Sequence, residues 1–208
     1  MRLLAVILLL FPLTLFSQNK LTEEKQREIL EKIDTEGSKM RSMQCEFTQT
    51  KSMKMLSRQM VSQGKMFFKK PNRLLWQYSS PYDYTFVLNG DNVQIKTSKS
   101  TQNINVQENK IFRRITGIIV DCITGAGLKN SPDFTAEIWE KDGAYFAKLY
   151  PKKKELKQIY EVVEIHFNTS FTMVSSVRMV EKSGDETLVK LNKTKINAPI
   201  KDEIFVID

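Results

Sequence analysis

Residues 64–90, GKMFFKKPNRLLWQYSSPYDYTFVLNG, decide the fold of this chain. They contain extended segments in which the even-numbered residues are large and apolar while most of their neighbours are polar. Because side chains alternate between the two faces of a strand, this pattern predicts a sheet with one apolar face. Asn89-Gly90 favours a tight hairpin turn, since both residues tolerate positive φ angles. The predicted face contains Leu74, Trp76, Tyr78, Tyr84, Phe86 and Leu88.

The segments on either side of this stretch predict more strands and two helical elements. Residues 21–43 carry an apolar stripe at helical spacing, with Thr22 as a candidate N-cap. Residues 108–128 carry a second stripe that three glycines interrupt, which predicts two short helices or one kinked helix. From Phe134 onward, strand-length segments alternate with turn residues, which is typical of an antiparallel meander.

A curved antiparallel sheet of about ten strands has an inner face too large to be filled by its own side chains, as in barrels that hold ligands. The apolar face of residues 64–90 therefore has two interpretations. It is the core beneath a helix, or it lines a cavity for acyl chains, in which each buried methylene contributes about 0.8 kcal/mol. Residues 52–63, with four Met or Leu among polar neighbours, predict a loop and part of a strand.

The first 18 residues fit a secretory signal peptide. Arg2 precedes the apolar run of residues 3–11, which is too short to span a bilayer. An uncleaved N-terminal anchor is the alternative. No Cys follows the run, so the exported protein is expected to be soluble and to carry no acyl anchor of its own. Since no linker, repeat or low-complexity tract divides them, residues 19–208 are predicted to form one domain.

The charge and the reactive side chains argue against several function classes. The net charge of +8 is scattered apart from short runs such as Lys152-Lys153-Lys154, which predicts no nucleic-acid partner. The positive charge has two interpretations. It favours contact with a membrane surface that bears anionic head groups, or it only keeps a solvated surface soluble. With one His and no nucleophile, phosphate-loop or dinucleotide motif, we expect no catalytic residues, metal site or cofactor, and no enzyme.

Residues 47–90 contain a spaced set of residues that goes beyond the strand pattern. The set consists of Phe47-Thr48-Gln49, Gly64, Phe67, Lys69-Lys70-Pro71-Asn72, Trp76, Pro81 and Gly90. It resembles the LolA family of periplasmic lipoprotein carriers. The resemblance implies a mainly β (α+β) fold: an unclosed antiparallel half-barrel of about ten or eleven strands, with a helical lid over a hydrophobic cavity. It also implies a periplasmic carrier that takes acylated lipoproteins from an inner-membrane transporter to an outer-membrane acceptor.

In this family, residues of the inner face meet the acyl chains. By position, the lid would be formed by residues 108–128. The Arg that holds the lid closed in well-known members is replaced here by Lys70, which is the latch candidate or an exposed basic residue; an ammonium lacks the fixed fork of a guanidinium. The acyl-binding candidates implied by the resemblance are Phe47, Leu74, Trp76, Tyr78, Phe86 and Leu88 on the strands, and Ile115, Ile118 and Ile119 on the lid.

The sequence is compatible with other functions and with either state of its two cysteines. The fold implied by the resemblance also serves glycolipid or free-lipid carriers and non-enzymatic sensing modules of the envelope, so fold alone does not fix the cargo. The protein is expected to be a monomer. Cys45 and Cys122 either pair, which would tie the first strand to the lid, or remain two buried free thiols.

Overall fold

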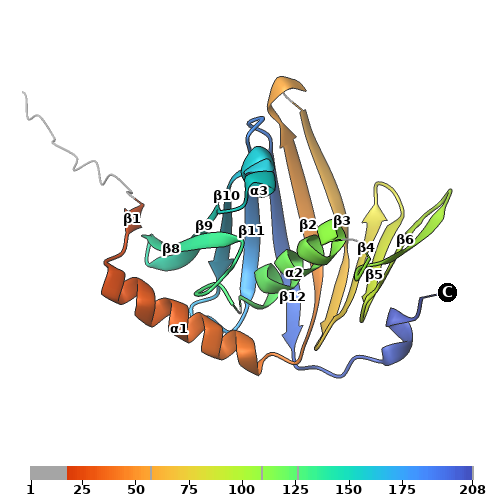
Figure 1. Cartoon of the computed structure of the whole chain (residues 1–208), viewed down its shortest axis with the longest axis horizontal. Helices are drawn as coiled ribbons and strands as arrows, with labels where there is room; N and C mark the ends of the chain where they lie inside the picture. The colour runs from red at the N-terminus through yellow and green to blue at the C-terminus, as the bar shows by residue number, and fades with distance from the viewer. Residues whose placement is uncertain (1–17, 57, 109, 126, 208) are drawn as a thin grey trace, which may run out of the picture.

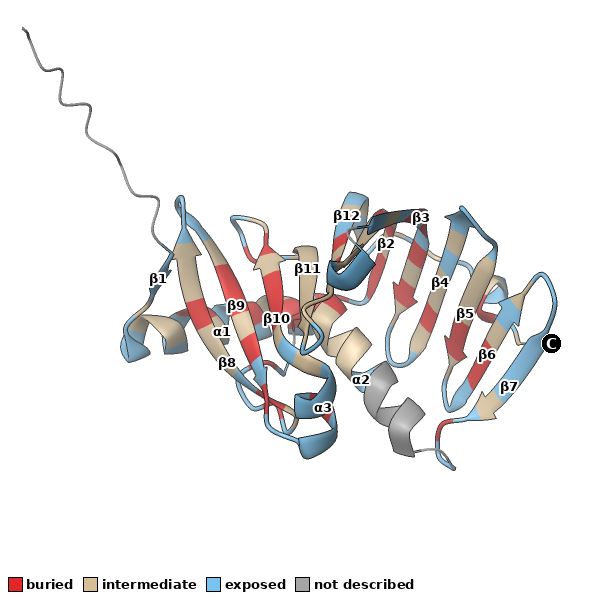
Figure 2. Ribbon diagram, turned by 90° about the horizontal axis from the view of Figure 1, so that it is seen from above, coloured by how far each residue is buried: buried red, intermediate tan, exposed pale blue. Residues whose placement is uncertain are grey.

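The chain forms one antiparallel sheet of twelve strands (Figure 1). The computed structural model describes residues 18–207 apart from 57, 109 and 126, and it describes residues 110–116 by their backbone alone. The strand order is β1-β8-β9-β10-β11-β12-β2-β3-β4-β5-β6-β7, so the first and last strands do not meet and the sheet stays open. Figure 2 shows the strands fanned around α2. The mainly β half-barrel with helical elements is therefore confirmed.

The strands and helices have the following bounds. The helices are α1 (Glu23–Lys39), α2 (Lys110–Thr124) and α3 (Lys154–Ile159), with short 3-10 turns at η1 (Lys54–Leu56) and η2 (Asp202–Phe205). The strands are β1 (Asn19–Lys20), β2 (Ser42–Met53), β3 (Arg58–Lys69), β4 (Arg73–Ser80), β5 (Tyr84–Asn89), β6 (Asn92–Thr97), β7 (Thr101–Asn105), β8 (Phe134–Lys141), β9 (Ala144–Pro151), β10 (Tyr160–Phe167), β11 (Val174–Glu181) and β12 (Glu186–Ile196). The strand number exceeds the expected ten or eleven, and one of the twelve strands is the two-residue β1.

The predicted helix of residues 21–43 is α1, and it begins as its sequence indicates. The Thr22 hydroxyl accepts a hydrogen bond from the Lys25 backbone N–H at 3.4 Å, which satisfies one of the free donors of the first turn. The helix is four residues shorter than predicted at its C-terminal end, because Met40 is already in an extended conformation. The predicted signal peptide, residues 1–18, lies outside the described residues except for Gln18.

The decisive stretch forms β3, β4 and β5, and the even-numbered residues of β4 and β5 share one face as predicted. The turn after β5 differs by one residue. Asn89 pairs with Asn92 inside the ladder, so the two loop residues are Gly90 and Asp91. Gly90 has φ +63°. Two-residue hairpin turns of type II′ need a positive φ only at their first position, which Gly90 occupies.

Two further segments agree with their predictions in kind. Residues 52–63 were expected to be a loop with part of a strand; the loop is the short turn η1, and β2 and β3 pair continuously below it from Ser42↔Lys69 to Met53↔Arg58. Residues 108–128 contain the single helix α2, and Gly117 lies inside it without ending it. The helix ends at Gly125, whose φ of +69° suits a C-terminal glycine.

The inner side of the sheet holds two apolar clusters. The first cluster lies between α1 and the strands β8–β11 and includes Ile33, Ile138 and Ile165. The second cluster lies on β2–β6 and includes Met43, Phe68 and Leu74, each essentially inaccessible to solvent. The second cluster is the one that contains the predicted apolar face, so it positions the candidate site.

Candidate functional site

The inner faces of β2–β6 align in three rows that run across the strands. The first row is buried throughout and consists of Met43, Phe68, Leu74, Leu88 and Val93. The second row begins buried and becomes half-buried toward β6; it consists of Cys45, Met66, Trp76, Phe86 and Ile95. The third row ends in half-buried aromatic rings and consists of Phe47, Gly64, Tyr78 and Tyr84. We call these three rows the apolar face; its first row is buried throughout, whereas its second and third rows each contain half-buried rings.

Phe47 is the best-packed member of the third row. Its ring, only 1% exposed, lies over Gly64 of β3, and its centroid is 4.5 Å from that of Trp76 and 5.1 Å from that of Tyr78. A Cβ on Gly64 would lie 2.6 Å from Phe47 Cζ, so only glycine leaves room for the ring at this position. The structure therefore brings Phe47 to the predicted strand residues, as expected from the family's first strand.

Trp76, Tyr78 and Phe86 are less completely covered than Phe47. The Tyr78 hydroxyl donates a hydrogen bond to Gln49 Oε1 at 2.9 Å. The Trp76 indole N–H is buried and has no hydrogen-bond partner among the described residues; the Tyr78 hydroxyl is close enough to interact with it, but the geometry is not that of a hydrogen bond. A buried donor without a partner costs free energy, so an oxygen placed beside it would be stabilising.

The helix α2 lies between the two clusters and contributes side chains to both. Ile119, Val120 and Ile123 pack against the apolar face. Ile118 and Cys122, one helical turn apart, pack instead against the cluster beneath α1. Ile118 and Ile119 thus pack against different clusters of the inner side, because successive residues of a helix point about 100° apart, and their role in acyl binding stays a prediction. The side chain of Ile115 lies outside the described residues.

The C-terminal end of α2 is anchored in the α1 cluster. A Cβ on Gly125 would lie 2.9 Å from the Phe167 ring and 3.0 Å from Ile33, so this turn is tightly packed. Two residues on, the Gly127 N–H donates to Asp34 Oδ1 at 2.8 Å. The helix is thus fixed at one end to α1 while its middle lies on the apolar face.

A cavity of about 290 Å³ lies where α2 meets the ends of β5 and β6. Leu88, Val106, Gly117 and Val120 line its apolar part, and Asn72, Asp91 and Gln107 line its mouth. This volume is at the lower end of the range of small-molecule sites, about 300–1,000 Å³. Among the described residues, much of the inner face is filled by contacts between its own aromatic rings, so a guest would enter by displacing α2 or by extending this cavity.

The hydrogen bonds of Lys70 go to α1 and not to the described part of α2. Its ammonium donates hydrogen bonds to the carbonyl oxygens of Gly37, at 3.2 Å, and Ser38, at 2.9 Å. Both carbonyls belong to the last turn of α1, where a positive charge is favoured by the helix dipole. The structure therefore places the predicted latch residue against α1, whereas the resemblance implied bonds to the lid.

The two cysteines are free thiols. Cys45 is buried in the second row of the apolar face, and Cys122 is half-buried on the side of α2 that packs against the α1 cluster. Burial raises the pKa of each thiol to about 12. The sequence allowed either a disulfide or two free thiols, and the structure has two free thiols.

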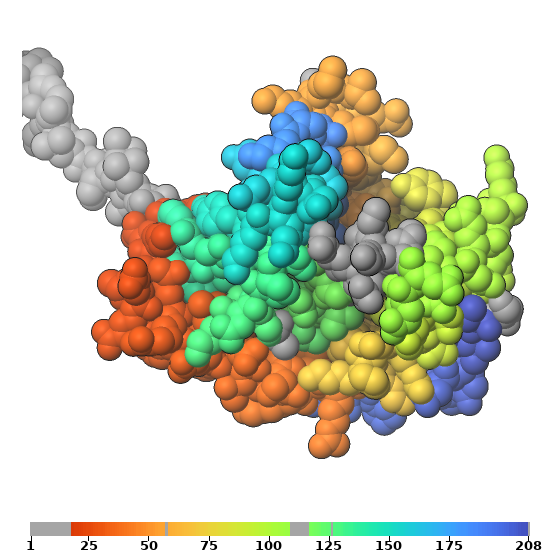
Figure 3. All heavy atoms as spheres, viewed as in Figure 1, coloured from red at the N-terminus to blue at the C-terminus, as the bar shows by residue number. Residues whose placement is uncertain are grey.

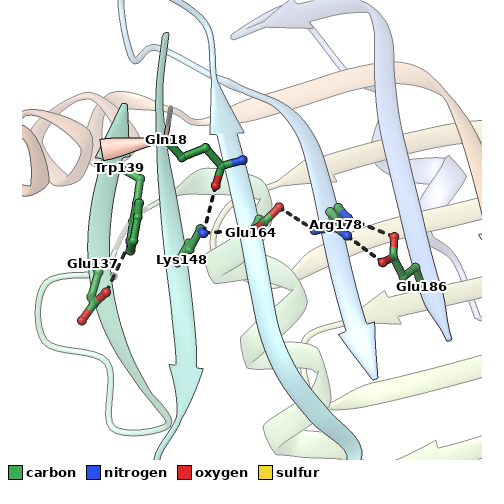
Figure 4. A network of polar contacts seen from close by, with 7 residues as sticks. All are labelled: Gln18, Glu137, Trp139, Lys148, Glu164, Arg178 and Glu186. Carbon is green, nitrogen blue, oxygen red and sulfur yellow. Dashed lines mark hydrogen bonds and ion pairs between the residues drawn. The ribbon is translucent and has the colours of Figure 1, made fainter. Parts of the chain in front are cut away.

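The outer face of β8–β12 is polar and internally paired (Figure 4). Arg178 donates to Glu164 at 3.1 Å and to Glu186 at 2.6 Å, and Lys148 lies 4.1 Å from the centre of the Trp139 ring. Glu164 and Glu186 are therefore paired with Arg178 and do not converge on a common open site. Among the described residues, no group of three or more His, Cys, Asp or Glu side chains is arranged to hold a metal ion.

Within residues 18–207, excluding the gaps named above, the structure contains no helix that combines the length and apolar character needed to cross a bilayer.

Comparison with known proteins relates this geometry to one family and several solved structures. The family model described as "Outer membrane lipoprotein carrier protein LolA" matches residues 38–208. A comparison with curated proteins finds no match. The solved structures similar to this chain include a putative outer membrane lipoprotein-sorting protein domain from Vibrio parahaemolyticus, with 8% identity, a TM-score of 0.50, and coverage of 88% of this chain and 97% of that chain.

Two further solved structures share the fold. Lipoprotein LppX of Mycobacterium tuberculosis has 10% identity and a TM-score of 0.50, with coverage of 86% of this chain and 99% of that chain. The MucA/MucB complex of Pseudomonas aeruginosa has 10% identity and a TM-score of 0.53, with coverage of 88% of this chain and 61% of that chain. Such low identities show the fold alone. The family match, by contrast, extends over most of the chain, which therefore belongs to the LolA family of outer membrane lipoprotein carrier proteins.

Proposed function

We propose that this protein is a periplasmic carrier that shields the acyl chains of lipoproteins between α2 and the apolar face, on their way from the inner to the outer membrane. The proposal includes export with removal of residues 1–18 and a single domain formed by residues 19–208. Its partners would be acylated lipoproteins, an inner-membrane transporter that releases them and an outer-membrane acceptor. The family match supports a carrier of lipoproteins or other lipids.

The observation that carries the proposal is the difference in exposure between the first row of the apolar face and the rings of its other two rows. Core residues of a closed domain are buried throughout, as in the first row. Trp76, Tyr78 and Phe86 are instead half-buried although they lie on the concave side, beneath or beside α2. Large rings left partly uncovered on a concave surface are typical of a site that completes its packing with a ligand.

The second support is the way α2 is attached. Its C-terminal end is packed against Phe167 and Ile33, whereas Ile119 and Val120 are only partly buried on the apolar face. A helix fixed at one end can move away from the sheet at the other without disrupting the α1 cluster. Each methylene of an acyl chain that replaces it would contribute about 0.8 kcal/mol.

The binding site is tested by photocrosslinking from neighbouring residues of β4. A photoreactive amino acid at Tyr78 faces the proposed site, and the same amino acid at Gln77 faces away from it and is exposed. In cells that make acylated lipoproteins, we expect crosslinks to lipoproteins from position 78 and none above background from position 77. Equal crosslinking from both positions, or none from position 78, would contradict the site.

The cargo is tested separately by mass spectrometry of protein purified from the periplasm. Co-purified acylated lipoprotein supports the proposal. A glycolipid or a free lipid in its place supports the second candidate, a lipid carrier with the same site. A partner protein that lacks acyl groups and crosslinks outside the apolar face would favour an envelope sensing module and overturn the carrier function.

A further inference from the structure

One end of the molecule carries exposed apolar side chains that the apolar face does not use. Met55 is 92% exposed and Leu56 is 66% exposed, and both lie in η1 at the tip of the long β2–β3 hairpin. Figure 1 shows this hairpin projecting beyond the neighbouring strands. Two adjacent apolar side chains this exposed cost free energy in water, so they indicate a surface that is covered in use.

The hairpin tip does not stand alone, because two other segments gather at the same end. The Lys54 backbone N–H donates to Asp185 Oδ1 at 3.0 Å, which joins the tip to the β11–β12 turn. On the other side of that turn, the Lys182 N–H donates to the Ile159 carbonyl at 2.9 Å, at the end of α3. Ile159 is itself half exposed. We call residues 51–60, 152–159 and 181–186 the hairpin end; Figure 3 shows the blue β11–β12 turn between the orange hairpin tip and the teal α3 segment.

The hairpin end is strongly basic. It contains eight Lys or Arg and four Asp or Glu, so it holds a net charge of +4, which is half of the +8 of the whole chain. Two of the acidic side chains are already paired, Glu181 with Lys51 and Glu186 with Arg178. Exposed apolar residues surrounded by positive charge match the surface of a bilayer that contains anionic lipids, where each Lys or Arg near the surface strengthens binding.

The half-buried part of the apolar face lies on the side nearer the hairpin end, as such a contact requires. Along β2, the first row lies at Met43 and the third row at Phe47, and the strand continues from there to the tip. The half-buried rings of the face therefore lie on the side nearer the hairpin end, and the fully buried row lies farther from it. An acyl chain that leaves a membrane touching the hairpin end would meet the uncovered side of the face first.

We propose that the hairpin end binds the surface of bilayers containing anionic lipids, with Met55 and Leu56 inserted among the head groups and Lys153, Lys154 and Arg58 held near the lipid phosphates. The contact is a property of the surface of this protein. It requires no bound cargo and goes beyond the carrier function proposed above.

The test is flotation with vesicles of two compositions. The protein is recovered from the periplasm of a bacterial host, and its mass is measured before use. One set contains phosphatidylethanolamine and phosphatidylglycerol, and the other contains only neutral phosphatidylcholine. We expect binding to the anionic vesicles alone and a loss of binding as salt is raised, because salt screens exposed charges. Equal binding to both compositions, or none to the anionic vesicles, would overturn the proposal.

Paired variants separate the hairpin end from the rest of the surface. Met55→Ser/Leu56→Ser and Lys153→Gln/Lys154→Gln are each expected to weaken binding to anionic vesicles about tenfold. The matched controls are Val206→Ser, an exposed apolar residue beyond η2, and Lys193→Gln/Lys195→Gln, exposed cations on the far half of β12. Controls that lose as much binding as the hairpin variants would contradict the proposed surface.

The flotation result is independent of the carrier test. Because the vesicles are offered to protein without added lipoprotein, a failure to float removes the membrane contact and leaves the crosslinks from Tyr78 unaffected. Conversely, missing crosslinks from Tyr78 would remove the acyl site and leave flotation as it is. Far-ultraviolet circular dichroism and the urea midpoint of each variant check that the substitutions, all at exposed positions, leave the fold intact.

Discussion

The rings of Phe47 and Trp76 meet across an intervening strand: their centroids lie 4.5 Å apart although β3 separates β2 from β4. The contact is allowed because Gly64, the β3 residue that pairs with Phe47, has no side chain and leaves room for the Phe47 ring. Phe47 thereby fills the space that a side chain on β3 would take, and it connects the first strand of the site to the aromatic residues of β4.

Gly64→Ala is therefore expected to destabilise the protein and to displace Phe47. The new Cβ would lie 2.6 Å from Phe47 Cζ and 2.0 Å from the Gln77 carbonyl oxygen, so both ring and backbone must shift. Overpacking of this kind costs about 1–3 kcal/mol in the free energy of unfolding, measured by urea denaturation. The control is Gly143→Ala. Nothing lies within 4 Å of its Cβ position, so this variant measures the cost of alanine in a turn with positive φ, without any overpacking. A Gly64→Ala variant with wild-type stability would show that Phe47 is not held against β3.

Lys70→Met is expected to loosen the last turn of α1. The ammonium now donates to the Gly37 and Ser38 carbonyls, and its loss leaves both acceptors to solvent. Because Lys70 is exposed, we expect a loss of only about 1 kcal/mol in the free energy of unfolding, with faster amide exchange at residues 37–40. Lys65→Met, an exposed Lys of the preceding strand β3, serves as the control. Faster exchange in α2 and not in α1 would instead support a latch on the lid.

The alternation along β4 and β5 was predictable because one side of these strands is buried, so burial imposes a period of two on Leu74, Trp76 and Tyr78. The start of α1 was predictable for a similar reason, since Thr22 and the acidic first turn are local signals. Family resemblance added Phe47, which no local pattern connects with Trp76.

The remaining features depend on contacts between distant segments. The end of the β2–β3 hairpin stands away from the core, so no buried face imposes alternation on Met53, Met55 and Met60, and their sequence resembles a loop. The different packing of Ile118 and Ile119 was not predictable because α2 touches two clusters, and an apolar stripe does not say which cluster lies on which side. The partner of Lys70 is 33 residues earlier in the chain, at Gly37, and no sequence spacing indicates that pairing.

Both thiols are expected to be unreactive in the native protein. Burial raises the pKa of Cys45 and of Cys122 to about 12, so at pH 8 almost none of either is the reactive thiolate. A chromogenic disulfide reagent should label neither thiol within minutes in buffer and both in urea, and the intact mass should show two free thiols. Rapid labelling of Cys122 alone would indicate that α2 leaves the α1 cluster on that timescale.

Asp121→Asn is expected to stabilise the protein at neutral pH and to have little effect in acid. Asp121 lies near the C-terminal end of α2, where burial, and secondarily the charge of Asp133, raises the pKa of its carboxyl to about 6 from an ordinary value near 4. Between these two pH values the folded state holds a proton that the unfolded state has released. Stability is thus highest below pH 4 and falls as the pH rises through about 6, as far as this group contributes.

The amide variant removes that pH-dependent cost. At pH 8 we expect Asp121→Asn to unfold at a higher urea concentration than the wild type, by about 1 kcal/mol once partial exposure of the carboxylate is allowed for, and the difference should vanish near pH 4. Asp83→Asn, at an exposed loop position, is the matched control for the substitution itself. A constant gain at all pH values would mean that the amide packs better, and a loss at pH 8 would show that the ionised carboxylate stabilises this end of α2.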